Sequence, residues 1–281
     1  MIRLFLASLA VLVGGSSAHA GEPIPKRIAS INLTADEVLV ELAPERLVSV
    51  TQWADDPGNS NIVGRVAPGV FRFMKADMEQ LVALRADLVV VSEYTDADFL
   101  QLISSTGMRY HRMEGLNDMA GVRRALLALG DVVGTPQKAA ALIARYDERL
   151  AELARRVEGV QRPRVLYWSG GMTAGADTAI GALIATAGGA NLGAELGIRG
   201  IAPPGAERAF AAQPDAILIG TWPGSEREVR EHALLGRTEA ARSGRIIVLP
   251  TRRLVTLSHH AADAAWELAA MLHPGRFPLE E

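Results

Sequence analysis

Cysteine is absent from this 281-residue chain. Its absence excludes a disulfide framework, a thiolate zinc site and a thiol nucleophile, and it leaves no residue for a lipid anchor after an export signal. Aromatic residues make up only 5% of the chain, so each can be weighed by its own position. The net charge of -3, with both signs interspersed, provides no basic face, so we do not expect a nucleic-acid partner.

The motifs of common enzyme classes are missing as well. The chain contains no G-x-S-x-G elbow, no P-loop, no dinucleotide fingerprint and no H-E-x-x-H zinc motif. The stretch Gly170–Gly175 is merely rich in glycine. We therefore expect no catalytic residues, no metal site and no resident cofactor.

The first twenty residues have the pattern of a cleavable export signal. Arg3 is basic, Leu4–Val13 is apolar, and Ala18–Ala20 has the small-x-small pattern that signal peptidase reads. The alternative, a transmembrane helix, would be unusually short. We predict a mature chain that begins at Gly21, is exported to the periplasm, is not stably inserted in a membrane and is a monomer.

Strand and helix patterns alternate in the first half of the mature chain. Strand patterns lie at 27–31, 47–50, 87–91 and 108–111. Helical patterns lie between them, one opened by an apparent capping box from Thr34 to Glu37 and others at 78–84, 95–105 and 117–129. This alternation predicts βα units and a mainly parallel sheet.

One long helix is predicted in the middle of the chain. Thr135 and Pro136 form a typical helix start, and nothing breaks the pattern before Val157. About twenty-three residues span roughly 35 Å in an α-helix. This segment, within residues 135–160, could join two lobes; an ordinary long surface helix is the alternative.

The second half repeats the style of the first. Strand patterns lie at 164–168, 215–219 and 245–249, with helical patterns at 178–187, 205–212 and 257–272 and a second apparent capping box from Ser225 to Glu228. Segments 78–90 and 206–218 match, since each has a short helix with a Glu, then an Asp, then a strand. We predict an α/β protein of two similar lobes, residues 21–134 and 161–281, bridged by the long helix.

These segments resemble a known family. The markers are 27–30 with Thr34, Asp36 and Glu37, then 79–89, 187–191 and 213–217. In this order, around a long helix, they are similar to the helical-backbone class of periplasmic substrate-binding proteins, which includes cobalamin, ferric-siderophore and haem binders. The resemblance implies a ligand cleft between the lobes and delivery of the ligand to the permease dimer of an ABC importer.

The resemblance also implies a docking role for two glutamates. Glu79 and Glu207 match positions at which relatives place one carboxylate on each lobe to meet arginines of the permease. Paired charges on short exposed helices would give a transient encounter its orientation and rate. The plain alternative is an idle surface carboxylate on each helix.

Aromatic side chains follow predicted strands, where open parallel sheets bind ligands. Trp53, Tyr94, Trp168 and Trp222 occupy such positions and are candidate ligand contacts. Core packing is the alternative for each, most of all for Trp168. A bulky ligand in such a cleft needs aromatic surface with a few polar groups around it.

Arginines are candidates for carboxylate or phosphate groups of the ligand. Arg72 and Arg252 are the first choices, with Arg65 and Arg253 beside them, although most arginines are simply surface residues.

Histidine provides no evident metal set. His259 and His260 are adjacent, and adjacent helical side chains point about 100° apart, so they are poorly placed to chelate one ion. Whether either residue contacts a ligand stays open, as it does for His111, and capping or surface placement is the alternative.

The sequence therefore predicts a periplasmic substrate-binding protein that captures a bulky metal chelate, a corrinoid or a ferric siderophore. A haem-binding protein of a haem importer is one alternative, because Tyr94 could hold iron. An accessory ligand-sensing lobe for a membrane receptor is the other.

Overall fold

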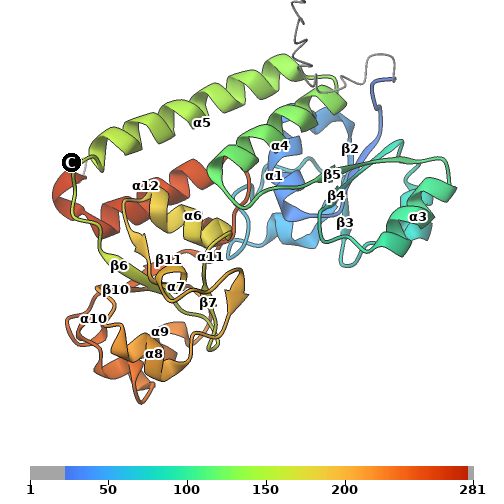
Figure 1. Cartoon of the computed structure of the whole chain (residues 1–281). Coiled ribbons are helices and arrows are strands. Elements are labelled where there is room, and N and C mark those ends of the chain that lie inside the picture. The colour runs from blue at the N-terminus through green and yellow to red at the C-terminus, as the bar shows by residue number, and fades with distance from the viewer. Residues whose placement is uncertain (1–22, 278–281) are drawn as a thin grey trace, which may run out of the picture.

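Two parallel β-sheets lie side by side along one long helix (Figure 1). The structure is a computed structural model and describes residues 23–277. The predicted export signal at 1–20 therefore lies outside the described residues. Among residues 23–277, no helix has both the length and the apolar character needed to cross a membrane.

The first sheet has five strands in the order β3-β2-β1-β4-β5, all parallel. They are β1 (Ile28–Ser30), β2 (Leu47–Thr51), β3 (Phe71–Phe73), β4 (Leu88–Ser92) and β5 (Arg109–Met113). The helices around this sheet are α1 (Leu33–Leu42), α2 (Met78–Ala83), α3 (Ala97–Ser105) and α4 (Met119–Val132). These elements form the N-terminal lobe, in which the predicted strands are confirmed and β3 is an addition.

The second sheet has four parallel strands in the order β11-β10-β6-β8. They are β6 (Arg164–Tyr167), β8 (Ala190–Asn191), β10 (Ala216–Gly220) and β11 (Ile246–Leu249), and a small antiparallel pair is formed by β7 (Thr173–Ala174) and β9 (Ile201–Ala202). The helices are α6 (Ala179–Thr186), α7 (Leu192–Glu195), α8 (Ala206–Ala211), α9 (Ser225–Glu231), α10 (Glu239–Arg242), α11 (Thr251–Leu254) and α12 (Ala261–Leu272). These elements form the C-terminal lobe.

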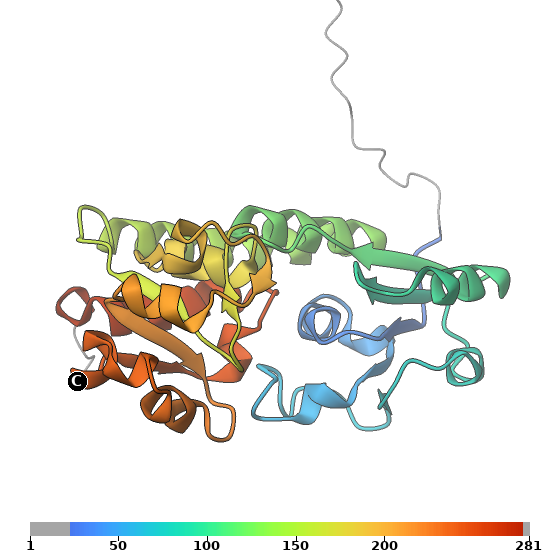
Figure 2. The same cartoon turned by 60° about the horizontal axis from the view of Figure 1, so that its bottom comes forward.

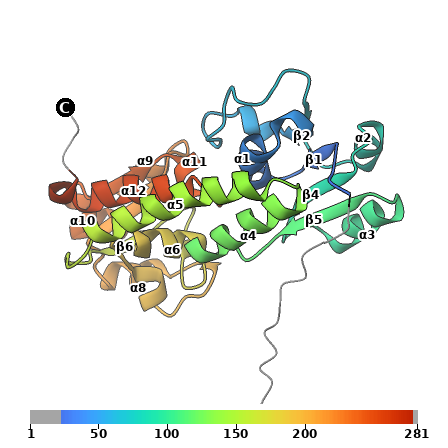
Figure 3. The same ribbon diagram turned by 90° about the horizontal axis from the view of Figure 1, so that it is seen from above.

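Helix α5 (Pro136–Arg156) is the predicted long helix. It packs against α1 and α4 of the N-terminal lobe and against α6 and α12 of the C-terminal lobe. Figures 2 and 3 show it running along both lobes. After Pro136 it contains no Gly or Pro, the usual causes of a kink, so it is a stiff connection.

Both predicted capping boxes are wrong. Helix α1 is capped by Asn32, whose side chain accepts from the Ala35 N–H at 2.9 Å. Glu37 is turned inward instead and bonds to side chains from other segments. Helix α9 begins after Gly224, and Glu228 accepts a hydrogen bond from Trp168. In both helices the glutamate of the predicted box bonds to a residue far away in the sequence and not to the start of its own helix.

The predicted closing helix at 257–272 is shorter than expected and has a different start. Helix α12 begins at Ala261, because Thr256 and Ser258 donate hydrogen bonds to the Glu37 side chain and divert the segment before it. Ala261 and Ala262 pack in the core of the N-terminal lobe, whereas the rest of the buried face of α12 packs in the core of the C-terminal lobe. The chain thus joins the lobes a second time, through its last helix.

Candidate functional site

The carboxyl ends of the two sheets face each other. Asn61, in the loop after β2, donates from Nδ2 to the carbonyl oxygen of Arg252, which follows β11, at 3.0 Å. A narrow crevice beside this contact is lined from both lobes, by Leu116 and Met119 on one side and Leu183 and Leu254 on the other. The facing edges are therefore the edges at which open parallel sheets hold ligands (Figure 2).

Three of the four predicted aromatic residues present surface at these edges. Trp53 lies in the 3-10 turn after β2 and is 48% exposed, and Tyr94, after β4, is 80% exposed. Trp222, after β10, is half-buried. Partial burial and the neighbouring Glu93 carboxyl group raise the pKa of the Tyr94 phenol.

Trp168 is placed differently from the other three. It is only 3% exposed and packs in the core of the C-terminal lobe. Its Nε1 donates to Glu228 Oε1 at 2.8 Å, and its ring meets the His232 ring edge to face. In this structure Trp168 positions Glu228 rather than presenting its own surface at the strand ends.

Trp222 borders a hollow of about 400 Å³ at the carboxyl end of the second sheet. Ser169, Ser225, Arg227, Glu228 and Glu231 also line it. Sequence analysis missed this polar set, since its members come from two segments that are far apart in the sequence, one after β6 and one after β10.

Gly220 makes the position of the Trp222 ring possible. A Cβ atom at residue 220 would lie 2.3 Å from Cζ3 of Trp222. A glycine that ends a buried strand is the one sequence signal that could have indicated this close approach.

Arg72 is engaged within its own lobe. Its Nε donates to Asp55 Oδ2 at 2.8 Å, its second terminal nitrogen to Asp55 Oδ1 at 3.2 Å, and its first to the Val70 carbonyl at 2.5 Å. The hydrogen bond from Arg72 also lowers the pKa of Asp55. This pair stiffens the rim that carries Trp53, but it uses the forked face with which an arginine would meet a ligand.

Two of the other predicted arginines are also paired. Arg65 lies 2.7 Å from Glu41, and Arg253 donates to Glu267 at 2.9 Å and to Asn61 Oδ1 at 3.2 Å. Arg252 is half-buried on α11, and within residues 23–277 the structure gives it no ion pair.

Asp36 is a buried carboxyl group that sequence analysis noted only as a family marker. It is fully buried, and its Oδ2 accepts from the Thr51 N–H at 3.0 Å and from the Thr51 hydroxyl at 2.6 Å. Burial raises its pKa to about 7, against the opposing effect of the hydrogen bonds from Ser30 and Thr51. Asp36 thus fixes the end of β2, from which the turn with Trp53 starts.

His259 and His260 lie in the turn before α12, so the expectation based on a helix does not apply to them. Their rings stack with centroids 4.0 Å apart, and His259 Nε2 is 3.7 Å from Glu41 Oε1. Burial lowers the pKa of His259 to about 3, so its ring is neutral at ordinary pH. The part of the chain that the structure describes contains no cluster of three His, Asp or Glu side chains that could hold a metal ion. His111 lies in the edge strand β5.

Glu79 and Glu207 occupy equivalent places. Each is the second residue of a six-residue helix, α2 in one lobe and α8 in the other, and each is exposed. Figure 3 shows these two helices on different lobes.

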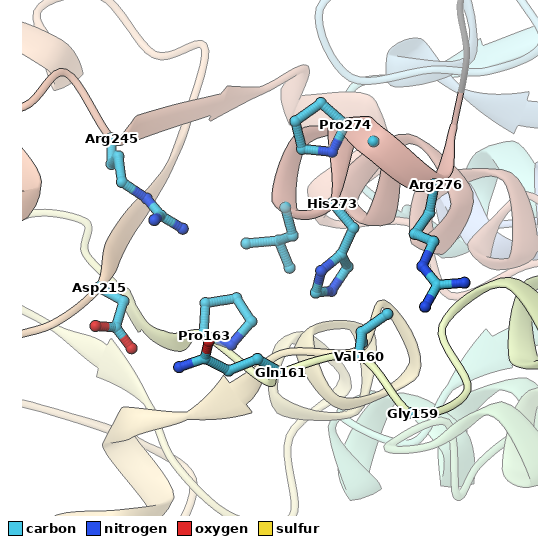
Figure 4. Close-up of a pocket in the computed structure, with 11 residues that line it drawn as sticks. Gly159, Val160, Gln161, Pro163, Asp215, Arg245, His273, Pro274 and Arg276 are labelled. Carbon is cyan, nitrogen blue, oxygen red and sulfur yellow. The ribbon is translucent and has the colours of Figure 1, made fainter.

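Another hollow lies at the opposite edge of the second sheet (Figure 4). It measures about 590 Å³ and is bordered by Asp215, Arg245, His273 and Arg276. All of its lining comes from the C-terminal lobe and the turn after α5, at the amino ends of the strands. It is therefore separate from the facing strand ends.

The architecture defined above, two α/β lobes with facing strand ends along one helix, is that of a class of ligand-binding proteins. The chain belongs to the periplasmic binding protein family, whose model matches residues 28–252. The resemblance to periplasmic substrate-binding proteins seen in the sequence is thereby confirmed, and so is the predicted α/β fold.

Individual relatives agree with this assignment. The chain is 28% identical over 204 residues to a cobalamin-binding protein of Halobacterium salinarum; the match covers 70% of this chain and 54% of that one, so the chain spans about half the length of its curated relative. A periplasmic heme-binding protein from Pseudomonas aeruginosa has a TM-score of 0.76 and 26% identity, over 91% of this chain and 95% of that one. The periplasmic heme-binding protein RhuT from Roseiflexus, in its apo form, has a TM-score of 0.76 and 23% identity, over 89% and 99%.

Proposed function

We propose that the protein captures a bulky metal chelate, a corrinoid or a ferric siderophore, between its lobes in the periplasm and delivers it to an ABC importer. The observation that carries this proposal is the facing of the two carboxyl edges, which display Trp53, Tyr94 and Trp222. Aromatic rings at a shared edge suit a large, partly apolar ligand.

The state of the arginines favours a corrinoid among these chelates. Arg65, Arg72 and Arg253 are tied to carboxylates of the protein, which leaves Arg252 as the predicted arginine without an ion pair within residues 23–277. A ligand rich in carboxylates would have to compete with those pairs, whereas the peripheral amides of a corrinoid would not. The cobalamin-binding relative supports the same choice.

Haem is the second candidate, and Tyr94 is the observation that favours it. Tyr94 is 80% exposed at the facing edge, and a tyrosine can serve as an axial ligand of haem iron. The accessory lobe of a membrane receptor would have the same fold, and a docking assay with a permease separates it from the importer component.

Ligand capture would involve little bending of the molecule. Helix α5 has no internal Gly or Pro and packs on both lobes, so closure is limited to a small tilt. The energy for transport would come from the ATPase of the importer.

Glu79 and Glu207 would dock the loaded protein on the permease. Replacing both by Ala is expected to abolish uptake and to leave ligand affinity within about twofold, because rim charges act mainly on encounter with a partner. The matched control is Glu148→Ala with Glu239→Ala, which removes two other exposed carboxylates. The docking role is contradicted if uptake persists when Glu79 and Glu207 are both replaced by Ala. It is also contradicted if the control pair abolishes uptake to the same extent.

Tryptophan fluorescence tests the proposed ligand class. Residues 21–281 are titrated with cyanocobalamin, cobinamide, haemin and ferric siderophores, with correction for absorbance by the ligand. Saturable quenching by a corrinoid or a ferric siderophore is expected, and Trp53→Phe and Trp222→Phe should each reduce it. Trp266→Phe is the control, because Trp266 packs under Arg149 on α5, away from the strand ends. Quenching by haemin alone favours the haem alternative, and no quenching by any compound rejects the proposal.

A further inference from the structure

A buried carboxyl group ties the two lobes together at the edges that face each other. Glu37 of α1 is 1% exposed. Its Oε1 accepts from the Asn61 N–H at 3.1 Å and from Asn61 Nδ2 at 2.7 Å. Its Oε2 accepts from the Thr256 hydroxyl at 2.9 Å and from the Ser258 hydroxyl. We call Glu37, Asn61, Thr256 and Ser258 the Glu37 clasp.

The clasp joins segments far apart in the sequence. Glu37 and Asn61 belong to the N-terminal lobe, whereas Thr256 and Ser258 follow β11 and α11 of the C-terminal lobe. The contact continues through Asn61, whose Oδ1 accepts from Arg253 and whose Nδ2 donates to the Arg252 carbonyl. It therefore connects the loop that begins with Trp53 directly to the segment that carries Arg252.

The chemistry of the clasp makes it costly to open. Each oxygen of Glu37 accepts two hydrogen bonds, and Ser258 is fully buried. Separating the lobes at this point would leave Oε2 of this buried carboxyl group without its two hydroxyl donors, Thr256 and Ser258, unless water entered. Helix α5 holds the lobes along their backs, and the clasp holds them at the facing edges.

We infer that the Glu37 clasp sets the separation of the two facing edges and holds the ligand-free protein in its ligand-competent geometry. The inference builds on the proposed function, since the edges it holds are those to which we assign the ligand. A protein held in this way spends less of its binding free energy on ordering. If the clasp is lost, the lobes sample wider arrangements and the apparent affinity falls in proportion to the competent fraction.

Distance measurements between the lobes test this inference without any ligand. The chain has no cysteine, so spin labels can be placed through Gln101→Cys on α3 and Arg242→Cys on α10, both exposed. A single narrow distance distribution is expected for the labelled wild-type protein and a broader, longer one for Glu37→Ala. An unchanged distribution in folded Glu37→Ala overturns the inference, whatever the ligand titrations show.

Two further variants separate positioning from general damage. Glu37→Gln is expected to restore the narrow distribution, because its amide oxygen still accepts from Asn61 and the Thr256 and Ser258 hydroxyls can rotate to accept from its N–H₂ group. Glu41→Ala, one turn further along α1, is the matched control, since it removes the Arg65 pair and leaves the clasp intact. If Glu37→Ala does not fold, Thr256→Val and Ser258→Ala each remove one donor from the clasp. If the distance distribution broadens in neither variant, the inference is overturned.

Affinity provides the functional measurement. Cyanocobalamin is titrated against the wild-type, Glu37→Ala, Glu37→Gln and Glu41→Ala proteins. Roughly tenfold weaker binding is expected for Glu37→Ala alone, if the competent fraction falls to about a tenth. If Glu37→Ala binds cyanocobalamin as tightly as the wild-type protein although its distance distribution is broader, the separation of the lobes does not limit affinity. That result contradicts the inference. If no protein binds cyanocobalamin or the other chelates, the proposed function fails, while the distances still decide whether the clasp holds the lobes.

Discussion

The two lobes share one set of contacts at the amino edges of their sheets. Asp87 accepts from the N–H groups of Lys26 and Arg27, and Asp215 accepts from that of Arg164. Each aspartate also donates its own N–H to the carbonyl of the matching arginine, at 2.9 Å in both lobes. Each first strand is thus fastened to its neighbour in the same way.

The short helices before those strands end alike as well. Arg27 donates to the carbonyl of Leu84 at the end of α2, and Arg164 donates to that of Ala212 at the end of α8. The next residues, Arg85 and Gln213, both have positive φ angles, 51° and 47°. Such left-handed residues end helices, and here they are not glycine in either lobe.

The carboxyl edges differ between the lobes. Helix α1 carries the buried side chains of Asp36 and Glu37, whereas Ala182 and Leu183 occupy the corresponding positions of α6. The N-terminal lobe exposes Trp53, while the C-terminal lobe buries Trp168.

The comparison separates scaffold from site. The contacts that the lobes share lie at the amino edges of the sheets, where they hold neighbouring strands in register. The contacts that differ lie where the lobes face each other, which is where an asymmetric ligand would require two different surfaces.

The largest expected effect comes from the two tryptophans that exemplify this difference. Trp168→Ala should lower the free energy of unfolding by about 3–5 kcal/mol, because it empties a packed core and leaves Glu228 without its donor. Trp53→Ala should change it by less than about 0.5 kcal/mol, as expected at an exposed position. Chemical denaturation measures both. Equal losses would show that Trp53 is structural too, and the assignment of its surface to ligand would fail.

The shared aspartates allow a smaller and more direct test of the symmetry. Asp87→Ala and Asp215→Ala should each lower the free energy of unfolding by about 1–2 kcal/mol, with the larger loss for Asp87, which accepts from two N–H groups instead of one. Glu158→Ala, an exposed carboxylate after α5, is the control for removal of surface charge. A lower free energy of unfolding in only one of the two variants would contradict the view that the two aspartates stabilise their lobes in the same way.

The smallest expected effect is a pH dependence specific to the N-terminal lobe. Burial raises the pKa of Asp36 from an ordinary value of 3.8 to about 7, so the folded state binds this proton more tightly than the unfolded state does. Its contribution to stability is therefore complete below pH 3.8 and is lost as the pH rises through about 7. Between pH 6 and pH 8 the wild-type protein should lose about 1 kcal/mol more stability than Asp36→Asn. Parallel stability curves for the two proteins would show that Asp36 is charged in the fold.

Much of the fold could be predicted from the sequence, because the signals that define its helices and strands lie within each element or next to it. The buried run of β4 and the Pro136 start of α5 are signals that the chain carries within a few residues. The matched positions of Glu79 and Glu207 could be found for the same reason, as each lies at the start of a short helix.

The site could be predicted only in part, because its decisive contacts are distant in sequence. Glu37 is read locally as a capping residue, and its partner Ser258 lies 221 residues away. Arg72 forms an ion pair with Asp55, and Trp168 donates a hydrogen bond to Glu228. Neither contact could be identified from the residues around Arg72 or Trp168. Exposed aromatics after strands could be identified, but which of them the fold would bury could not.

Hydrogen exchange with and without cyanocobalamin shows whether the ligand is held between the two carboxyl edges. We expect simultaneous protection of residues 52–61 and 221–228, one segment from each lobe, with no change at 157–163 and 273–276 around the hollow of Figure 4. Protection confined to one lobe, or protection around that hollow instead, would contradict this placement of the ligand.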